Sequence, residues 1–484
     1  MSTTSTAAAP PIPPSTPAGR VSRWTLPTLA YAVLVVSALQ TLVVPIVHDI
    51  GATLGSSPSA AGWVVTANLL AAAVMTPLLG RLGDVRGRRP VLIGILIAMV
   101  AGSVLAAATS SLVLLLVARV LQGASYGIFP LAIGVLRDEL PARKLTAAMA
   151  VVSGCLAIGG GVGLVATGLL TVDHGDYHRV FWLSVVLSII ALVTTAVFVP
   201  RRRPTVEGSV DWLGGTVLGA ALVLLLLPLS QGNDWGWGSA ATLGCFAASA
   251  LLFAAFVAVE KRVTDPLVSM RMMTHRPIAV TNIAGLFLGA AMFIGFLGAT
   301  FLVETPPIVG YGFGATVLSA SVVYLLPGSL SGILTAPIGG LLVTRFGGKF
   351  TLMVAMLCSA AGFGFLAGWH DHSWQVITAA VIVFTGVTFG YAAMPALLVE
   401  QVTPAETGIA NSVNSIARST GSSIASALVA TVLTRNLIPG LPVPHEQQFV
   451  VVFLIGTAGC LLAALVVAFG LQRTDRGRAV VETR

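Results

Sequence analysis

Charged residues are rare in this chain, so the few that interrupt its apolar stretches are where chemistry should be sought. Arg119 and Arg418 stand inside long apolar runs. A guanidinium at the centre of a membrane helix costs about 2.5 to 3.5 kcal/mol, so each should face a partner or a cavity. For Arg119, a structural tie to backbone carbonyls or to Gln122 is one reading. For Arg418, substrate contact and interhelical bonding remain equally open.

Polar residues on one helical face accompany Arg418. Asn411, Asn414 and Arg418 follow one another at spacings of three and four, which places them on one side of a helix that should avoid lipid. Further polar residues expected inside the helical bundle, as candidates for a substrate cavity, are Gln40, Asn68, Gln122, Tyr126, Asn282, Tyr324 and Tyr391. Scattered single polar groups in an apolar cavity suit amphipathic compounds, neutral or anionic rather than cationic.

The acidic residues are informative by their positions. All 18 Asp and Glu residues fall in predicted loops or near predicted helix ends, and Asp49 and Glu304 come closest to the membrane interior. No carboxylate is predicted at mid-membrane. Proton coupling would therefore have to use one of these two acids, a histidine outside the membrane, or protonation of the substrate itself.

A basic, glycine-containing stretch separates two apolar segments at Gly80–Arg89, and a weaker copy recurs at Gly339–Lys349. We expect both stretches to be short loops outside the bilayer. Gly80 and Gly87 would let helices approach closely, and Asp84 would pair with a nearby arginine or lie at a helix N-terminus. The alternative is a basic loop that only sets topology. Paired hinges indicate an internal duplication, which is common in secondary transporters.

Composition places the chain among polytopic membrane proteins. It has 484 residues, 56% hydrophobic and 9% charged, with a mean hydropathy of +0.93. The basic residues lie in short loops rather than on a soluble face, so nucleic-acid binding is not expected. There is no Gly-x4-Gly-Lys-Ser/Thr, His-Glu-x-x-His or Gly-x-Ser-x-Gly motif. We therefore predict neither an enzyme nor a bound cofactor or metal, and interpret His370-Asp371-His372 as solvated loop polarity, with a metal site or pH sensor as alternatives.

Fourteen apolar segments are long enough to cross a bilayer, which takes about 20 residues. They run over residues 26–48, 60–80, 90–109, 112–136, 145–171, 179–199, 212–230, 239–259, 277–303, 315–343, 350–368, 374–398, 408–434 and 449–471. With the N-terminus inside, 22 of the 26 Lys and Arg residues fall on the cytoplasmic side and two outside. This bias predicts that both termini are cytoplasmic.

The hinges follow spans two and ten, so the repeat unit is six helices and the order is six, two, six. The predicted parts are a disordered cytoplasmic tail (1–25), a six-helix bundle (26–200), an inserted two-helix segment with its flanking loops (201–276), a second six-helix bundle (277–471) and a cytoplasmic tail (472–484).

Together these motifs resemble the major facilitator superfamily, and the helix count resembles its fourteen-helix drug:proton antiporter branch. The hinge signature is matched at Gly80, Leu82, Asp84, Gly87, Arg88 and Arg89. A second signature is matched at Arg119, Gln122 and Gly123, and a third only partly at 159–164. Two positions depart from the branch. Gln40 stands where the branch usually has an aspartate in its first helix, and Gly160 stands where it has a proline.

The resemblance implies a mechanism. The hinge contacts would lock one access state and break in the other, through Gly80, Asp84, Arg86, Gly87, Arg88, Arg89, Arg345 and Lys349. The residues to examine for proton coupling would be Arg119, Asp49 and Glu304. We expect a monomeric, multi-pass multidrug-type exporter of small amphipathic compounds in the bacterial plasma membrane. It would be coupled to protons and work by alternating access. Alternatives are a facilitator or exporter of an anionic metabolite or lipid, and a membrane sensor without transport.

Overall fold

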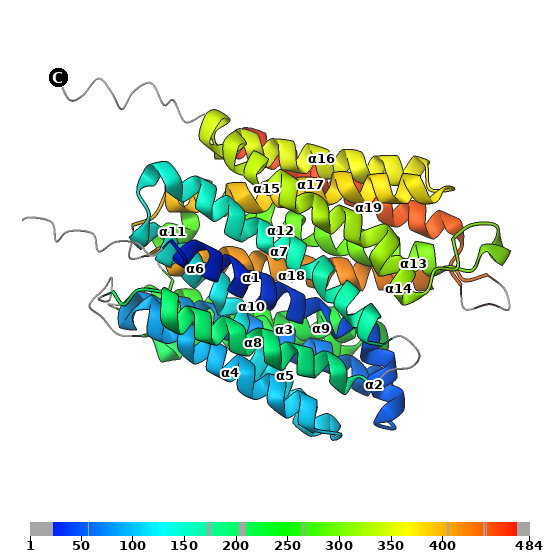
Figure 1. Cartoon of the computed structure of the whole chain (residues 1–484), viewed down its shortest axis with the longest axis horizontal. Coiled ribbons are helices and arrows are strands. Elements are labelled where there is room, and N and C mark those ends of the chain that lie inside the picture. Colours follow the sequence, from blue (N-terminus) through cyan, green and yellow to red (C-terminus); the bar gives the residue numbers. More distant parts are fainter. Residues whose placement is uncertain are drawn as a thin grey trace, which may run out of the picture.

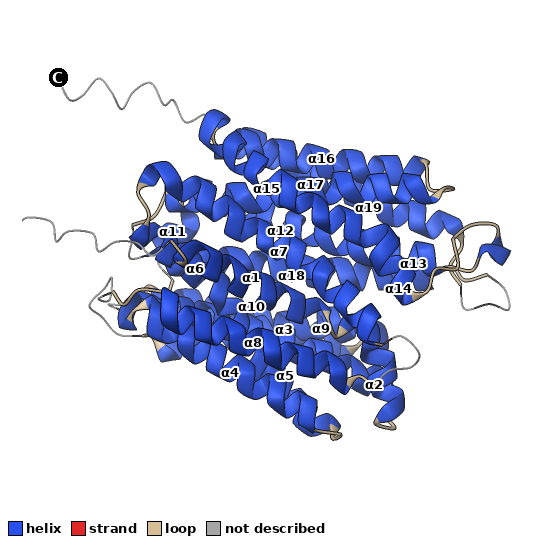
Figure 2. Cartoon of the chain, in the orientation of Figure 1, coloured by secondary structure: helices blue, strands red, loops and turns tan. Residues whose placement is uncertain are grey.

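Helices make up nearly all of the described chain. The structure is a computed structural model that describes residues 23–56, 58–171, 176–202, 210–263, 266–268, 270–403, 406–438, 441 and 443–471. Within these residues the only β-contact is an isolated bridge between Leu437 and Pro444, and Figure 2 shows helices throughout. The all-α prediction is confirmed. The predicted tails lie outside the described residues, apart from 23–25.

The first half of the molecule is built from helices that begin and end within a few residues of the predicted spans. These are α1 (Thr25–Thr41), η1 (Val44–Ile46), α2 (Val47–Thr53), α3 (Pro58–Arg86), α4 (Arg88–Ala108), α5 (Leu112–Gly123), η2 (Ala124–Gly127), α6 (Ile128–Glu139), α7 (Ala142–Leu170) and α8 (His178–Phe198). The first span breaks at Thr41, earlier than expected. Pro45, in the short turn η1, has no N–H for a helical hydrogen bond.

An inserted pair and a second half follow. The pair is α9 (Trp212–Trp235) and α10 (Ala240–Glu260). The second half contains α11 (Met270–Thr274), α12 (Arg276–Phe293), η3 (Ile294–Gly298), α13 (Ala299–Glu304), η4 (Pro307–Val309), α14 (Val317–Ser319), η5 (Ala320–Leu325), α15 (Leu326–Phe346), α16 (Gly348–Gly368), α17 (Ser373–Val399), α18 (Thr407–Thr434) and α19 (Glu446–Gly470). The segments η3 and η5 are π-helical. The first continues α12, and the second leads into α15.

Thirteen helical segments within the described residues are long and apolar enough to cross a membrane. The remaining long apolar helix, α1, has 17 residues. Because a bilayer offers no water to backbone groups, an apolar run of this length satisfies its own N–H and C=O groups as a helix. The multi-pass membrane fold is thus confirmed, whereas the count of fourteen crossings stays a prediction.

The hinges differ from the loops that were expected. Residues 80–86 belong to α3, so the charged stretch is helical and the turn consists of Gly87 alone, with φ of 93°. The second hinge is likewise one residue, Gly347, with φ of 87°. Only glycine takes this conformation without strain, which is why one residue suffices to reverse the chain. Pro77 and Pro337 each lie ten residues before their hinge glycine, inside α3 and α15.

The helices form two groups that meet along a central interface (Figure 1). The halves touch where α7 packs on α15 and where α3 packs on α18. The inserted helices pack on each other, and α9 also touches α3 and α18. In Figure 1, α1 begins and α19 ends at the left, the end where α3 turns into α4 and α15 turns into α16. We call this the hinge end and the opposite one the far end.

Small residues set the closeness of α7 and α15. A Cβ added to Gly154 would lie 2.5 Å from the Cβ of Ala336, and one added to Gly161 would lie 1.9 Å from Ser329 Oγ. Small side chains let membrane helices approach closely without a hydrophobic driving force. Gly154 and Gly161 of α7 therefore face the second half, whereas Gly159 and Gly163 lie against α1 of the first half.

Candidate functional site

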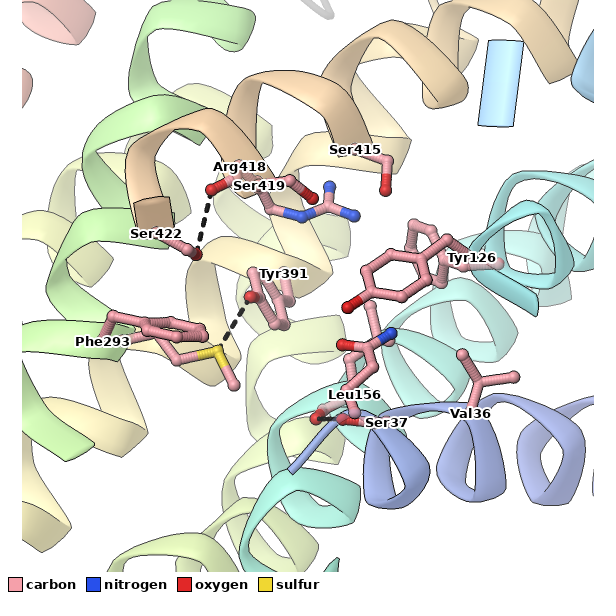
Figure 3. A pocket seen from close by; sticks show the side chains of 13 residues that line it. Val36, Ser37, Tyr126, Leu156, Phe293, Tyr391, Ser415, Arg418, Ser419 and Ser422 are labelled. Atoms are coloured by element: carbon pink, nitrogen blue, oxygen red, sulfur yellow. Dashed lines mark hydrogen bonds between the residues drawn. The ribbon is translucent and has the colours of Figure 1, made fainter. Parts of the chain in front are cut away.

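A cavity of about 60 Å³ lies at the centre of the interface between the halves (Figure 3). The first half supplies residues from α1, η2, α6 and α7, and the second half supplies residues from α12, α17 and α18. The lining consists of Val36, Ser37, Gln40, Tyr126, Phe129, Leu156, Met292, Phe293, Tyr391, Ser415, Arg418, Ser419 and Ser422. Apolar and aromatic walls with a few hydroxyls and one charge are typical of a small-molecule site.

Arg418 is the charged side chain of this lining. It is 7% exposed, and its guanidinium carbon lies 5.1 Å from the ring centres of both Phe129 and Tyr391. The two rings come from opposite halves, so the cation–π contacts join the halves through one side chain. Figure 3 shows the guanidinium pointing toward the space between Ser415 and Tyr126.

A polar relay behind the cavity holds Arg418 in place. Its Nη1 donates to Asn414 Oδ1 at 2.5 Å, and Asn414 Nδ2 donates to Asn282 Oδ1 at 3.2 Å. Gly285 makes room for this arrangement, because a Cβ there would lie 2.8 Å from Asn414 Nδ2. The relay fixes the position of the guanidinium and leaves much of its donor capacity facing the cavity.

The predicted cavity candidates divide into three sets. Gln40, Tyr126, Tyr391 and Arg418 line the cavity. Asn282 and Asn414 lie behind it in the relay. The others lie elsewhere: Asn68 donates to Arg119 O, Gln122 bonds to Arg119 and Ser103, Tyr324 bonds to Ser373, and Asn411 donates to Thr407 O.

Arg119 is enclosed within the first half. It is 2% exposed, its Nε donates to Val64 O at 3.0 Å and its Nη1 donates to Gln122 Oε1 at 2.6 Å. Gln122 in turn donates to Ser103 Oγ at 3.0 Å, which ties α3, α4 and α5 together. The geometry is that of the structural tie, and Arg119 does not reach the cavity.

The two acids considered for proton coupling also lie away from the cavity. Asp49 is an exposed residue of α2, and Glu304 is the half-buried last residue of α13. His370 corrects the expectation of a solvated loop: it is 8% exposed, with ring nitrogens at 2.9 Å from Leu366 O and 3.0 Å from Glu446 Oε1. Packing at the far end buries it beside the start of α19.

The first hinge is held by a buried ion-pair network. Asp84, 0% exposed, accepts from Arg88 Nη2 at 2.9 Å. Arg88 also donates to Asp138 and, at 3.2 Å, to Gly134 O. Arg89 donates to Ala196 O at 2.6 Å. These bonds fasten the hinge onto α6 and α8 of its own half.

The same hinge also touches the opposite half. A Cβ on Gly408 would lie 2.6 Å from Asp84 Oδ2, so this carboxylate lies against the first turn of α18. A carboxylate is favoured at a helix N-terminus, where N–H groups lack helical partners. Gly80 brings α3 against α18, since a Cβ there would lie 2.3 Å from Ser412 Oγ. Gly87, by contrast, has no such close neighbour and serves as the turn, which corrects the expectation of a close approach there.

Arg137, at the end of α6, makes a further connection between the halves. It donates to Val402 O at 2.9 Å, to Thr403 O at 3.0 Å and to Thr407 Oγ1. These acceptors lie between α17 and α18, in the second half. No sequence motif points to this contact, because basic residues are common at the cytoplasmic ends of membrane helices. Arg137 and Asp84 thus both connect the two halves at the hinge end.

The second hinge has no such network. Arg345 is exposed, with its guanidinium carbon 5.4 Å from the ring centre of Phe346, and Arg86 of the first hinge is exposed as well. Lys349 donates to Ala468 O at 2.6 Å and to Leu471 O, both in α19 or directly after it. The second hinge is therefore anchored within its own half.

Comparison with known proteins agrees with this architecture. The sequence model of the Major Facilitator Superfamily matches residues 29–326 and 286–483. The chain belongs to the Major Facilitator Superfamily. The resemblance predicted from the hinge is thereby confirmed, and the protein is a multi-pass membrane transporter rather than an enzyme.

Individual members of the superfamily are similar over most of their length. The chain is 30% identical over 417 residues to the tetracenomycin C resistance and export protein of Streptomyces glaucescens, covering 85% of this chain and 76% of that one. It is 29% identical over 391 residues to the multidrug transporter protein MdtP of Bacillus subtilis, covering 79% and 71%. The fold is similar to that of the human organic anion transporter MFSD10, with a TM-score of 0.63 at 15% identity, covering 92% and 99%.

Proposed function

We propose that this transporter exports small amphipathic compounds, neutral or anionic, across a bacterial plasma membrane by alternating access. The observation that carries the proposal is a central cavity lined from both halves and shut at the hinge end by contacts between the halves. The names of the relatives from Streptomyces glaucescens and Bacillus subtilis, an export protein and a multidrug transporter, support export as the direction.

The distribution of Lys and Arg supports placing the hinge end in the cytoplasm. In that orientation the structure is closed toward the cytoplasm, and Asp84 and Arg137 form the cytoplasmic gate. The six-two-six division and a monomeric working unit belong to the same proposal.

Proton coupling is proposed for the energy source, without a carboxylate in the cavity. The lining contains no Asp or Glu, and Arg119 is occupied by its structural bonds. Asp49, Glu304, a histidine outside the membrane and a protonated substrate are therefore the remaining carriers. Each charge moved through 100 mV is worth about 2.3 kcal/mol, which can sustain a concentration ratio of about fifty for the exported compound.

A second candidate function is facilitated or gradient-driven export of an anionic metabolite or lipid. Arg418 favours it, because a cation in an apolar cavity without a nearby carboxylate is suited to a negatively charged headgroup. A sensor without transport would bind ligands in the same cavity but show no flux.

The test is transport into everted vesicles with an imposed pH gradient, using a library of neutral, anionic and cationic lipophiles. We expect accumulation of neutral and anionic compounds that stops when a proton uncoupler is added. Accumulation that survives the uncoupler would select the second function, and binding without accumulation would select the sensor.

A pair of variants sharpens the substrate class. Arg418→Gln should lower accumulation of anionic compounds about tenfold, the loss of about 1.4 kcal/mol of binding, and that of neutral compounds much less. Arg435→Gln, at the end of the same helix but outside the cavity, is the matched control and should leave both unchanged. Equal losses for the two compound classes would contradict an anion-binding role for Arg418.

A further inference from the structure

The inserted helix pair brings two acids together at the hinge end. Asp211 is the N-cap of α9, and its Oδ1 accepts from Gly214 N at 2.8 Å. Glu260 is the last residue of α10, and its Oε2 accepts from Val268 N at 3.2 Å. Because α9 and α10 are antiparallel neighbours, the start of one lies beside the end of the other.

Each acid has a second oxygen that is buried and without a hydrogen-bond partner, Asp211 Oδ2 and Glu260 Oε1. Both oxygens lie over Gly214: a Cβ on that residue would be 2.4 Å from Asp211 Oδ2 and 2.7 Å from Glu260 Oε1. Glu260 is only 3% exposed. A buried oxygen left without a donor costs roughly 1 to 3 kcal/mol, so two of them beside the same glycine require an explanation.

Among the described residues, the positive charges near this pair do not balance it. Arg81 of α3 is 9% exposed, its Nε has no partner, and it acts electrostatically on both Glu260 and Asp84. Lys261 and Arg262, next along the chain, are exposed. One buried cation, shared with the hinge acid, thus faces two carboxylates. A proton shared between two neighbouring carboxylates removes the repulsion between them.

We propose that Asp211 and Glu260 hold one shared proton and form a proton-binding site on the inserted pair, separate from the central cavity. The proton gives each orphaned oxygen a partner. A metal ion fits less well, because Arg81 repels cations and the described residues contain no group of three or more metal-ligating side chains. The site is also linked to the gate: when the proton leaves, the pair gains charge and draws Arg81 away from Asp84.

The presence of the proton can be measured without any transport assay. The full-length protein in nanodiscs, in chelator-treated buffer, is titrated from about pH 5 to about pH 9 while the infrared C=O band of protonated carboxyl groups is recorded. We expect a band that titrates in the wild type and is lost in Glu260→Gln and in Asp211→Asn. Asn keeps the N-cap, and both variants should unfold at or above the wild-type temperature.

The matched control is Glu139→Gln. Glu139 is a buried carboxylate like Glu260, but it accepts from Arg202 at 2.7 and 3.0 Å and is therefore fully paired. The titrating band should survive in this variant. A wild type without a titrating band, a band that survives both Glu260→Gln and Asp211→Asn, or a band that disappears when Na⁺ or Mg²⁺ is added in place of protons would overturn the proposal.

The link to the gate has its own readout. In a version without native cysteines, Ser412→Cys reports opening of the hinge end, because Ser412 is 0% exposed and packed against Gly80. We expect the rate of labelling by a membrane-impermeant maleimide to depend on pH with an intact pair, and to lose that dependence in Glu260→Gln. Arg81→Gln should lose it too while keeping the infrared band. Unchanged pH dependence in both variants would show that the pair and the gate are independent.

Discussion

The two hinges are built on the same turn but fastened in different ways. Gly87 and Gly347 have nearly the same φ, and a proline precedes each by ten residues. Around the first, Asp84, Arg88 and Asp138 form buried ion pairs, and α3 lies against the opposite half. Around the second, the hydrogen bonds of Lys349 among the described residues go to its own half. A duplicated turn has thus become a latch in one copy and remained a simple connection in the other.

The largest difference should appear when the ion pairs are broken. Asp84→Asn leaves Arg88 buried with one acid fewer, and we expect a loss of about 3 kcal/mol in the free energy of unfolding and at least about tenfold in transport. Arg345→Gln at the second hinge removes an exposed charge and should cost less than about 0.5 kcal/mol. Denaturant unfolding in mixed micelles and vesicle transport measure both. Similar losses at the two hinges would refute the comparison.

The next effect concerns the connection between the halves. Arg137→Gln removes three donations to the second half, and we expect Ser412→Cys to be labelled about tenfold faster, as for a shift of about 1.4 kcal/mol toward the open gate. Arg202→Gln is the matched control, because Arg202 bonds to Glu139 within the first half. Faster labelling in the control as well would point to general loosening rather than a latch.

A smaller effect is expected from the close contact of α3 with α18. Gly80→Ala places a methyl group against Ser412 Oγ and 3.2 Å from Gly408 O, which should cost about 1 kcal/mol and slow transport about fivefold. Adding Ser412→Ala removes the hydroxyl and should restore most of the rate. If the double variant is as slow as the single one, the contact with the α18 backbone dominates instead.

The smallest difference between the two hinges should come from the turns themselves. Gly87→Ala and Gly347→Ala each force a non-glycine residue into positive φ at a place where a Cβ meets nothing closer than 3.5 Å. Each should cost roughly 1 to 3 kcal/mol in stability, nearly the same at both hinges, because φ near 90° with an extended ψ is a conformation that glycine alone adopts readily. Thermal unfolding of the two variants side by side measures this. A much larger cost at Gly87 would mean that the turn, not the ion pairs, distinguishes the first hinge.

Much of the fold was predictable because apolar length and basic residues are governed by the bilayer rather than by tertiary detail. Most predicted span ends fall within a few residues of the observed helix ends. The exceptions have local causes: Pro45 ends α1 early, and α3 runs on to Arg86 because its charges fold back onto protein rather than leaving the helix.

The cavity was predictable only in part. A polar side chain in an apolar membrane helix is expected to face protein or a cavity rather than lipid. This made it possible to predict Gln40, Tyr126, Tyr391 and Arg418. Phe129 and Met292 could not be found, since an apolar side chain gives the same signal whether it faces a cavity, a neighbouring helix or lipid. Arg137 escaped for a related reason, because basic residues at helix ends are common and nothing in the sequence indicates what they touch.

The position of α9 has a consequence for how a compound reaches the protein. This helix packs on both α3 and α18. The other inserted helix, α10, lies outside α9, and only 17% of the residues in its apolar stretch are buried. On this side the inserted pair covers the interface between the halves. On the other side α7 packs against α15 across the interface. A compound dissolved in the surrounding lipid therefore meets packed helices rather than a lateral opening between the halves. Its route in should run through the water at one end of the bundle, so uptake should follow the aqueous concentration of the compound more closely than its membrane partitioning.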